Sequence, residues 1–142
     1  MVKRVMVLLM VVGSLLLAFQ QIPATLKNIL LLKKYNIPLV DIRPVQEIKV
    51  TGMIKWAYSI PMISRYGGIL YSNIAIFKRK FPKGSTIAII TKTGLDAIPV
   101  ARILEQNGYR VILLKGGYNF LFKDMMNNMD KFLTLDIIKK LP

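Results

Sequence analysis

The sequence predicts an α/β fold in which helices cover both faces of a central parallel sheet, a three-layer α/β/α arrangement of about four to five strands. Short apolar runs rich in β-branched residues alternate along the chain with stretches of helical periodicity. Proline, glycine and asparagine separate these segments. With 142 residues, 54% of them hydrophobic, the chain is long and apolar enough for one domain with a full core.

The predicted strands are short and carry few polar side chains, as expected of strands buried on both faces. The run Thr86–Ile90 is the most apolar and is predicted to be central. The segment "FPKGS" before it predicts a turn. The predicted strands are residues 38–42, 57–61, 86–90 and 110–114.

The predicted helices follow from apolar residues that recur at helical spacing. They span residues 24–34, a short turn after Pro44, residues 67–80, residues 97–107 with Gly108 as their C-terminal cap, and a stretch from Asn119 onward. Their expected core-facing residues are Leu26, Ile29 and Leu30; Val45 and Ile48; Ile69, Leu70, Ile74 and Phe77; Val100, Ile103 and Leu104; and Phe122, Met125, Met129, Phe132 and Leu133.

The N-terminus has the pattern of an export signal or membrane anchor. Lys3 and Arg4 precede an uncharged apolar run from Val5 to Phe19. A bilayer core asks for about 20 residues of helix, so the run is marginal as a span. We predict a hydrophobic helix in residues 1–21, acting as a signal peptide or an anchor, and a domain in residues 22–142. A buried first helix of a soluble domain is the alternative.

The flanks of the apolar run also predict where the domain lies. Ala18 is the best cleavage candidate, but Leu16 stands where a small residue is preferred, which favours an uncleaved anchor. Positive charge before the run places the rest of the chain outside the cytoplasm. The expected localisation is therefore membrane-anchored with the domain in the periplasm or extracellular space, or secreted if the segment is cleaved.

The chain is strongly basic, with 21 lysines and arginines against 7 acidic residues and a formal net charge of +14. Such a charge attracts anionic partners. For a tethered domain we favour a membrane surface over nucleic acid, with a solvated basic face as the alternative. The tightest basic cluster, in "FKRKFPK", is Lys78, Arg79, Lys80 and Lys83.

The chain contains no cysteine and no histidine. Disulfides, thiol catalysis and histidine acid–base chemistry are therefore excluded, and so are most zinc sites. No metal or cofactor is expected.

Aromatic residues in "KWAYS" form another candidate contact surface. Strand alternation predicts Trp56 and Tyr58 on one face. Core packing is favoured over contact with a partner or with lipid head groups.

The loop Thr91-Lys92-Thr93-Gly94-Leu95-Asp96 stands between a predicted strand and a predicted helix. Gly94 permits a tight turn, and Asp96 is expected to cap the helix that follows. Backbone N–H groups and the positive end of a helix favour an anion at such a place. Many strand–helix connections share these features, so the loop alone is a weak signal.

The order of motifs resembles the rhodanese-like domain family over roughly residues 25–125. "PLVDIRPVQEI" and "TGMIKWAYSIP" resemble the first half of the family, and "IAIITKTGLDAIPVARILEQNGYRVILLKGGYNFL" resembles the second half, with Gly-Gly before an aromatic. The resemblance implies the α/β/α fold and favours a structural role for Asp41 and Arg43 in tying loops together. The first-half matches are Asp41, Arg43, Glu47, Gly52, Ile54, Ala57, Ile60 and Pro61, with Met53 in place of the family's histidine.

The departures from the family fall on its chemistry. Thr91 stands where sulfur-transferring members have the cysteine that carries sulfane sulfur, and a hydroxyl cannot store it. Lys92 keeps a positive charge, whereas Asp96 replaces a later arginine and Ala97 a serine. Thr91 also lacks a histidine base, and the pair Asp41 and Glu47 is better explained as structural than as acid–base. The sequence therefore predicts no enzyme.

We expect a non-catalytic binding or scaffolding module whose partner is a protein or an anionic lipid surface. The alternative is an anion-binding module for sulfate, phosphate or thiosulfate, or an accessory protein of sulfur metabolism, that uses the degenerate loop 91–96. The residues expected to contact an anion or partner are Lys92, Thr93, Gly94, Asp41 and Arg43.

Overall fold

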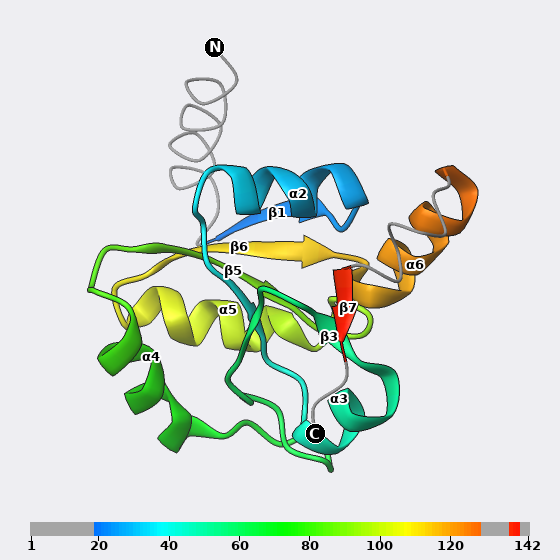
Figure 1. The fold of residues 1–142 in the computed structure, drawn as a ribbon. Helices are drawn as coiled ribbons and strands as arrows, with labels where there is room; N and C mark the ends of the chain where they lie inside the picture. The colour runs from blue at the N-terminus through cyan, green and yellow to red at the C-terminus, as the bar shows by residue number, and fades with distance from the viewer. Residues whose placement is uncertain (1–18, 129–136, 140–142) are drawn as a thin grey trace.

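A computed structural model describes residues 19–128 and 137–139. Five parallel strands form the central sheet in the order β1-β6-β5-β2-β4 (Figure 1). The sheet confirms the predicted α/β architecture with a central parallel sheet. The strands are β1 (Gln20–Pro23), β2 (Leu39–Asp41), β4 (Tyr58–Ser59), β5 (Thr86–Ile90) and β6 (Arg110–Lys115).

Helices cover both faces of the sheet. They are α2 (Leu26–Lys34), α3 (Val45–Thr51), α4 (Ile74–Lys80, preceded by the 3₁₀ turn η1, Tyr71–Asn73), α5 (Ala97–Gln106) and α6 (Gly117–Asn128). Buried side chains of α4 and α5 pack on one face, and those of α2, α3 and α6 pack on the other. Residues 1–18 of the predicted N-terminal hydrophobic helix lie outside the described residues.

Strand β5 is central, as its composition predicts. Ile87 and Ile89 enter the core beneath α4 and α5, while Ala88 and Ile90 enter the opposite core. Successive side chains of a strand point to opposite faces, so a strand covered on both sides needs an apolar residue at every position.

Strand β1 was not expected from the sequence. It lies at the sheet edge and pairs with β6, with Gln20 opposite Ile112. Its residues QQIP show no apolar run, and Pro23 suits an edge because it has no N–H to donate. Phe19, only 9% exposed, packs in the core beneath α4 and α5. The folded unit therefore begins within the segment assigned to the N-terminal signal or anchor.

The helix predicted at 67–80 is shorter than expected. Its regular part starts at Ile74, which is buried together with Phe77. Ile69 forms an isolated antiparallel bridge with Ile63 instead of a helical turn. Gly67 has a φ of +88°, which a right-handed helix does not allow.

The exposed side of α2 also differs from the prediction. Ile29 and Leu32 are buried, whereas Leu30 is 36% exposed. Leu26 is half-buried. Ile29 lies on both the predicted and the observed stripe, so the core-facing side is shifted by about a quarter turn, from the Leu30 side to the Leu32 side.

A second, small sheet forms where a helical pattern was predicted to continue. Strand β3 (Met53–Ile54) pairs antiparallel with β7 (Ile138–Lys139). In α6, Met125 is buried and Phe122 is half-buried, as expected. The other predicted core residues of this stretch, Met129, Phe132 and Leu133, lie outside the described residues.

Trp56 and Tyr58 do not share a strand face. Trp56 lies in a turn and packs against the core beneath α2 and α6, with the Lys33 ammonium 4.5 Å from its ring centre. Tyr58 begins β4 and is 40% exposed. Within residues 19–128 and 137–139, no helix combines the length and the apolar character that crossing a bilayer requires.

Candidate functional site

The loop 91–96 follows β5 at the edge of the sheet where the strands end, which is where parallel α/β sheets bind ligands. Thr91 is fully buried, and its Oγ1 accepts the N–H of Gly94 at 2.9 Å. The Thr93 hydroxyl accepts the N–H of Leu95 at 3.3 Å. Two of the amides that an anion would need are therefore already used by threonine hydroxyls of the loop.

The start of α6 holds the loop from behind. The N–H groups of Tyr118 and Asn119 donate to the carbonyl oxygens of Thr91 and Lys92 at 2.9 and 3.0 Å. A Cβ on Gly117 would lie 2.2 Å from the Thr91 carbonyl oxygen, and one on Gly94 would lie 2.9 Å from the Gly116 nitrogen. Gly94 and Gly117 are thus required for the close approach of loop and helix.

The outer residues of the loop face solvent. Lys92, Thr93 and Asp96 are exposed, and Leu95 is 74% exposed. Asp96 occupies the N-cap position of α5, but its side chain makes no capping hydrogen bond, so the predicted cap is wrong. Its φ of −71° and ψ of −13° are already helical, whereas a capping side chain normally needs an extended backbone.

A buried ion pair lies below the loop, at the end of β2. Arg43 Nη2 is 2.7 Å from Asp41 Oδ2, and Arg43 Nε donates to Asp41 Oδ1 at 3.0 Å. Asp41 is fully buried and Arg43 is 2% exposed. Neither of these predicted contact residues lies on the surface.

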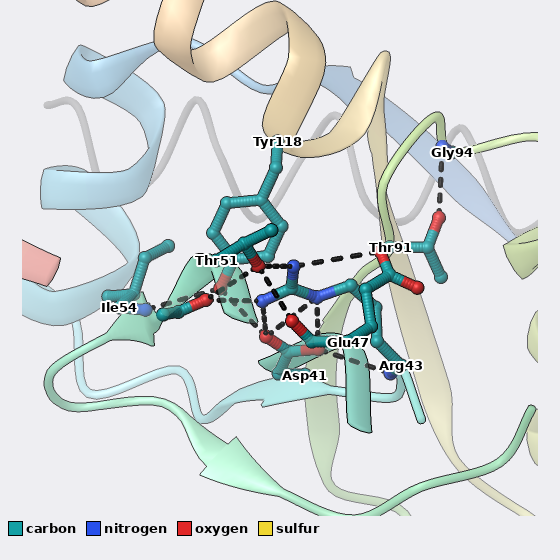
Figure 2. Close-up of polar contacts among 9 residues, drawn as sticks. Asp41, Arg43, Glu47, Thr51, Ile54, Thr91, Gly94 and Tyr118 are labelled. Carbon is teal, nitrogen blue, oxygen red and sulfur yellow. Dashed lines mark hydrogen bonds and ion pairs between the residues drawn. The ribbon is translucent and has the colours of Figure 1, made fainter. Parts of the chain in front are cut away.

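The remaining donors of Arg43 bind α3 and the residue after it (Figure 2). Nη1 donates to Thr51 Oγ1 at 2.8 Å, and Nη2 donates to the carbonyl oxygen of Gly52 at 2.7 Å. Glu47 Oε1 lies 3.7 Å from Nη1. Asp41 and Arg43 thus tie the end of β2 to α3, which is the structural role that the resemblance implied.

Tyr118 completes this network from α6. Its hydroxyl donates to Asp41 Oδ2 at 2.8 Å and accepts the N–H of Ile54 at 3.2 Å. Its ring lies under the Arg43 guanidinium, 4.0 Å from the guanidinium carbon to the ring centre. Sequence reasoning missed Tyr118, although the aromatic residue after Gly116-Gly117 was a signal for it.

The pKa values of two members of the network, Arg43 and Tyr118, are raised above their ordinary values. Burial raises the pKa of Tyr118 well above its ordinary value, and the neighbouring Asp41 carboxylate raises it further. Burial disfavours the charged form of Arg43, but the hydrogen bond and charge of Asp41 outweigh this effect, and the pKa of Arg43 is raised. Arg43 therefore stays charged and Tyr118 stays neutral in the folded network.

The chemistry open to the loop is limited. The chain has no cysteine, so no persulfide can form on it. The described residues contain no group of His, Cys, Asp or Glu side chains that could hold a metal ion.

The basic cluster lies at the other end of the strands. Lys78, Arg79 and Lys80 form the last turn of α4, and Lys83 lies in the turn that leads into β5. All four side chains are exposed, and the Lys80 ammonium lies 4.3 Å from the centre of the Tyr58 ring.

The order of strands and the Gly-Gly helix start behind the loop define a class of protein. The rhodanese-like domain family matches residues 23–121, and the chain belongs to that family. Within it, this chain has Thr91 in the loop after β5 and no cysteine anywhere, so it lacks the residue that sulfurtransferase catalysis of this family uses.

Solved structures support the fold. A rhodanese-like domain protein from Staphylococcus aureus is 24% identical, with 72% of this chain and 90% of that one covered and a TM-score of 0.57. A protein from Staphylococcus saprophyticus is 28% identical, covering 71% of this chain and 91% of that one, with a TM-score of 0.53.

A third structure, reduced CoADR-RHD from Bacillus anthracis, is 22% identical with a TM-score of 0.60. It covers 78% of this chain, but this chain spans only 18% of that much longer protein. No curated protein matches this chain.

Proposed function

We propose that the chain is a membrane-tethered or exported rhodanese-like module that binds a protein partner and does not transfer sulfur. The observation that supports this proposal best is Thr91. Its side chain is fully buried and its hydroxyl accepts the Gly94 N–H, so the sulfur-carrying position presents no reactive group. What the loop presents to the outside is Leu95, flanked by Lys92, Thr93 and Asp96.

The exposed side of the loop is better suited to binding a partner than to catalysis. Leu95 is a large apolar side chain that is 74% exposed, at the edge of the sheet where the family places its chemistry. The loop is rigidly backed by α6 through the hydrogen bonds of Tyr118 and Asn119. A rigid support reduces the conformational entropy that binding must overcome.

The anion-binding alternative has less support. The N–H groups of Gly94 and Leu95 already have hydroxyl acceptors, and Asp96 adds a carboxylate at the mouth of the loop. Calorimetry with sulfate, phosphate and thiosulfate separates the two functions. An anion site would release heat that weakens in Lys92→Ala and changes in Asp96→Glu, whereas a binding module would give none.

The experiment is photo-crosslinking from the loop in native membranes. Because the chain lacks cysteine, Leu95→Cys can be labelled at one place with a photoreactive maleimide. We expect a discrete protein conjugate, identified by mass spectrometry and lost when Lys92→Glu and Asp96→Lys are added. A probe at Val50, which is 72% exposed on α3, is the matched control. The proposal is wrong if both probes give the same conjugates or none.

A further inference from the structure

All five strands of the sheet run in the same direction, so their starts lie at one edge. We call this the amino edge. Strands β1 and β6 start on the left in Figure 1. Strand β1 starts there at Gln20, and in the sequence the apolar run Val5–Phe19 ends directly before it. Phe19 already belongs to the core, so no linker separates the apolar run from the sheet.

The amino edge is also where basic side chains gather. Connecting helices in this architecture run back against the strands, so α2, α4 and α5 end at the amino edge. Cations in the last turn of a helix are favoured by its dipole. The exposed cations at this edge are Lys33, Lys34, Lys78, Arg79, Lys80, Lys83 and Arg110.

Part of this set lies close together, around the turn before β5 and the start of β6. Lys78 and Lys83 line an open depression of about 550 Å³ together with Gln106 and Gly108. The alkyl chain of Lys83 lies across Gly108, where an added Cβ would be 2.8 Å from it. Arg110 follows at the start of β6, two residues before Ile112, the partner of Gln20. The basic surface therefore extends to the strand beside the entry of the apolar run.

Glu105 is an acidic group at this edge, and its charge interacts with that of Arg110. Glu105 lines the same depression, and its Oε1 accepts the N–H of Val111 at 3.2 Å. Asp41 and Asp96 lie at the opposite edge, at the end of β2 and after β5.

We propose that the amino edge is a docking surface for the anionic phospholipids of the membrane in which the N-terminal segment is held. The inference rests on the tether in the proposed function and adds an orientation to it. An extended residue spans only about 3.3–3.6 Å, so a sheet that begins directly after an anchor lies against the bilayer surface. Lipid head groups would then meet the cations of the amino edge.

This orientation has a consequence for the loop 91–96. The loop follows the end of β5, so it lies at the edge opposite the membrane. Leu95 would point away from the lipid, open to a partner in the aqueous phase. Lipid binding and partner binding would use opposite edges of one sheet.

The test uses the full chain in vesicles that contain phosphatidylglycerol and lipids with a nitroxide on the head group. Two single-cysteine variants, Gln106→Cys at the amino edge and Leu95→Cys in the loop, receive the same fluorophore, since both positions are exposed. We expect quenching of the label at 106 and its absence at 95. The triple variant Lys78→Glu, Lys80→Glu and Lys83→Glu should lose the quenching at 106 while staying with the vesicles.

The outcomes separate the orientation from the tether. A chain that does not float with the vesicles overturns the tether, and the inference with it. A chain that floats but is quenched at 95, or equally at both sites, overturns the orientation alone. Quenching at 106 that persists in phosphatidylcholine vesicles or in the triple variant overturns the role of anionic lipid. If added duplex DNA abolishes the quenching at 106 while the protein stays with the vesicles, the amino edge would be a nucleic-acid surface instead.

Discussion

The hydroxyl of Tyr118 lies 2.8 Å from the Asp41 carboxylate, across 77 residues of sequence. The backbone N–H of the same tyrosine donates to the carbonyl oxygen of Thr91 at 2.9 Å. One residue thus joins the ion pair below the loop to the loop itself. The loop 91–96 is therefore fixed to the start of α6 by backbone hydrogen bonds and, through the Tyr118 side chain, to the ion pair.

Tyr118→Phe removes a buried hydroxyl that donates to a carboxylate and accepts an amide. We expect a loss of about 1–3 kcal/mol in the free energy of unfolding, since both partners remain buried. Urea unfolding measures it, with Tyr66→Phe as the control because Tyr66 is 90% exposed. Equal midpoints for wild type and Tyr118→Phe would contradict the role of the hydroxyl.

The same pair of proteins reports on alkaline pH. The pKa of Tyr118 is raised in the folded state, so above about pH 10 the unfolded chain loses this proton first. The unfolded state then binds fewer protons, and the free energy of unfolding falls as the pH rises towards the folded pKa. The free energy of unfolding of Tyr118→Phe should fall less steeply with pH over that interval. Identical slopes for the variant and wild type would show that Tyr118 is not the titrating group.

Arg43→Met leaves the buried Asp41 carboxylate without its counter-ion. Removing one partner of a buried pair typically costs about 3–5 kcal/mol, which we expect here from thermal or urea unfolding. Arg65→Met is the matched control, because Arg65 is exposed. Adding Asp41→Asn to Arg43→Met should recover part of the loss, and a double variant less stable than the sum of the single ones would refute the pairing.

Gly117→Ala tests the contact between α6 and the loop. Gly67 and Gly117 both have positive φ, +88° and +58°, but a Cβ on Gly67 meets no atom within 4 Å. Gly67→Ala should therefore show only the backbone cost of about 1–2 kcal/mol. Gly117→Ala should cost clearly more, because its Cβ meets the Thr91 carbonyl oxygen. Comparable unfolding midpoints for the two variants would mean that the loop 91–96 moves away from the added Cβ at little cost in stability.

The purified chain should form no thiocyanate from thiosulfate and cyanide. No cysteine is present to accept sulfane sulfur, and Thr91 is buried. An active sulfurtransferase added to the same assay is the positive control. Turnover by wild type that disappears in Thr91→Val would show that a hydroxyl serves the reaction after all.

A reporter fused after Pro142 tests the predicted orientation of the chain. Lys3 and Arg4 precede the apolar run, which predicts that the C-terminus lies outside the cytoplasm. Alkaline phosphatase, active only after export, should be active in this fusion, and a reporter that works only in the cytoplasm should be silent. Moving the charges, by Lys3→Gln and Arg4→Gln with lysines placed after Phe19, should weaken or reverse this pattern.

Much of the fold could be predicted because its signals are local. A run such as Thr86–Ile90 shows burial on both faces in its own composition, and glycine marks the end of α5 at Gly108. Strand β1 has no such signal, since Gln20 and Gln21 are polar and an edge strand buries little. The buried side of α2 could not be predicted either, because Leu30 and Leu32 are identical residues and only packing against the sheet decides that Leu32 is buried.

The sequence by itself determined the family, the order of the elements other than strands β1, β3 and β7, and the absence of a sulfur-carrying cysteine, since each depends on which residues follow one another. Only the tertiary structure decided that the Thr91 hydroxyl accepts the N–H of Gly94 and that the Tyr118 hydroxyl donates to Asp41. It also decided that the basic residues lie at the same edge as the start of β1. These relations arise from packing between distant segments. A chain pattern records which residues are present, but contacts across the sheet exist only once the strands have paired.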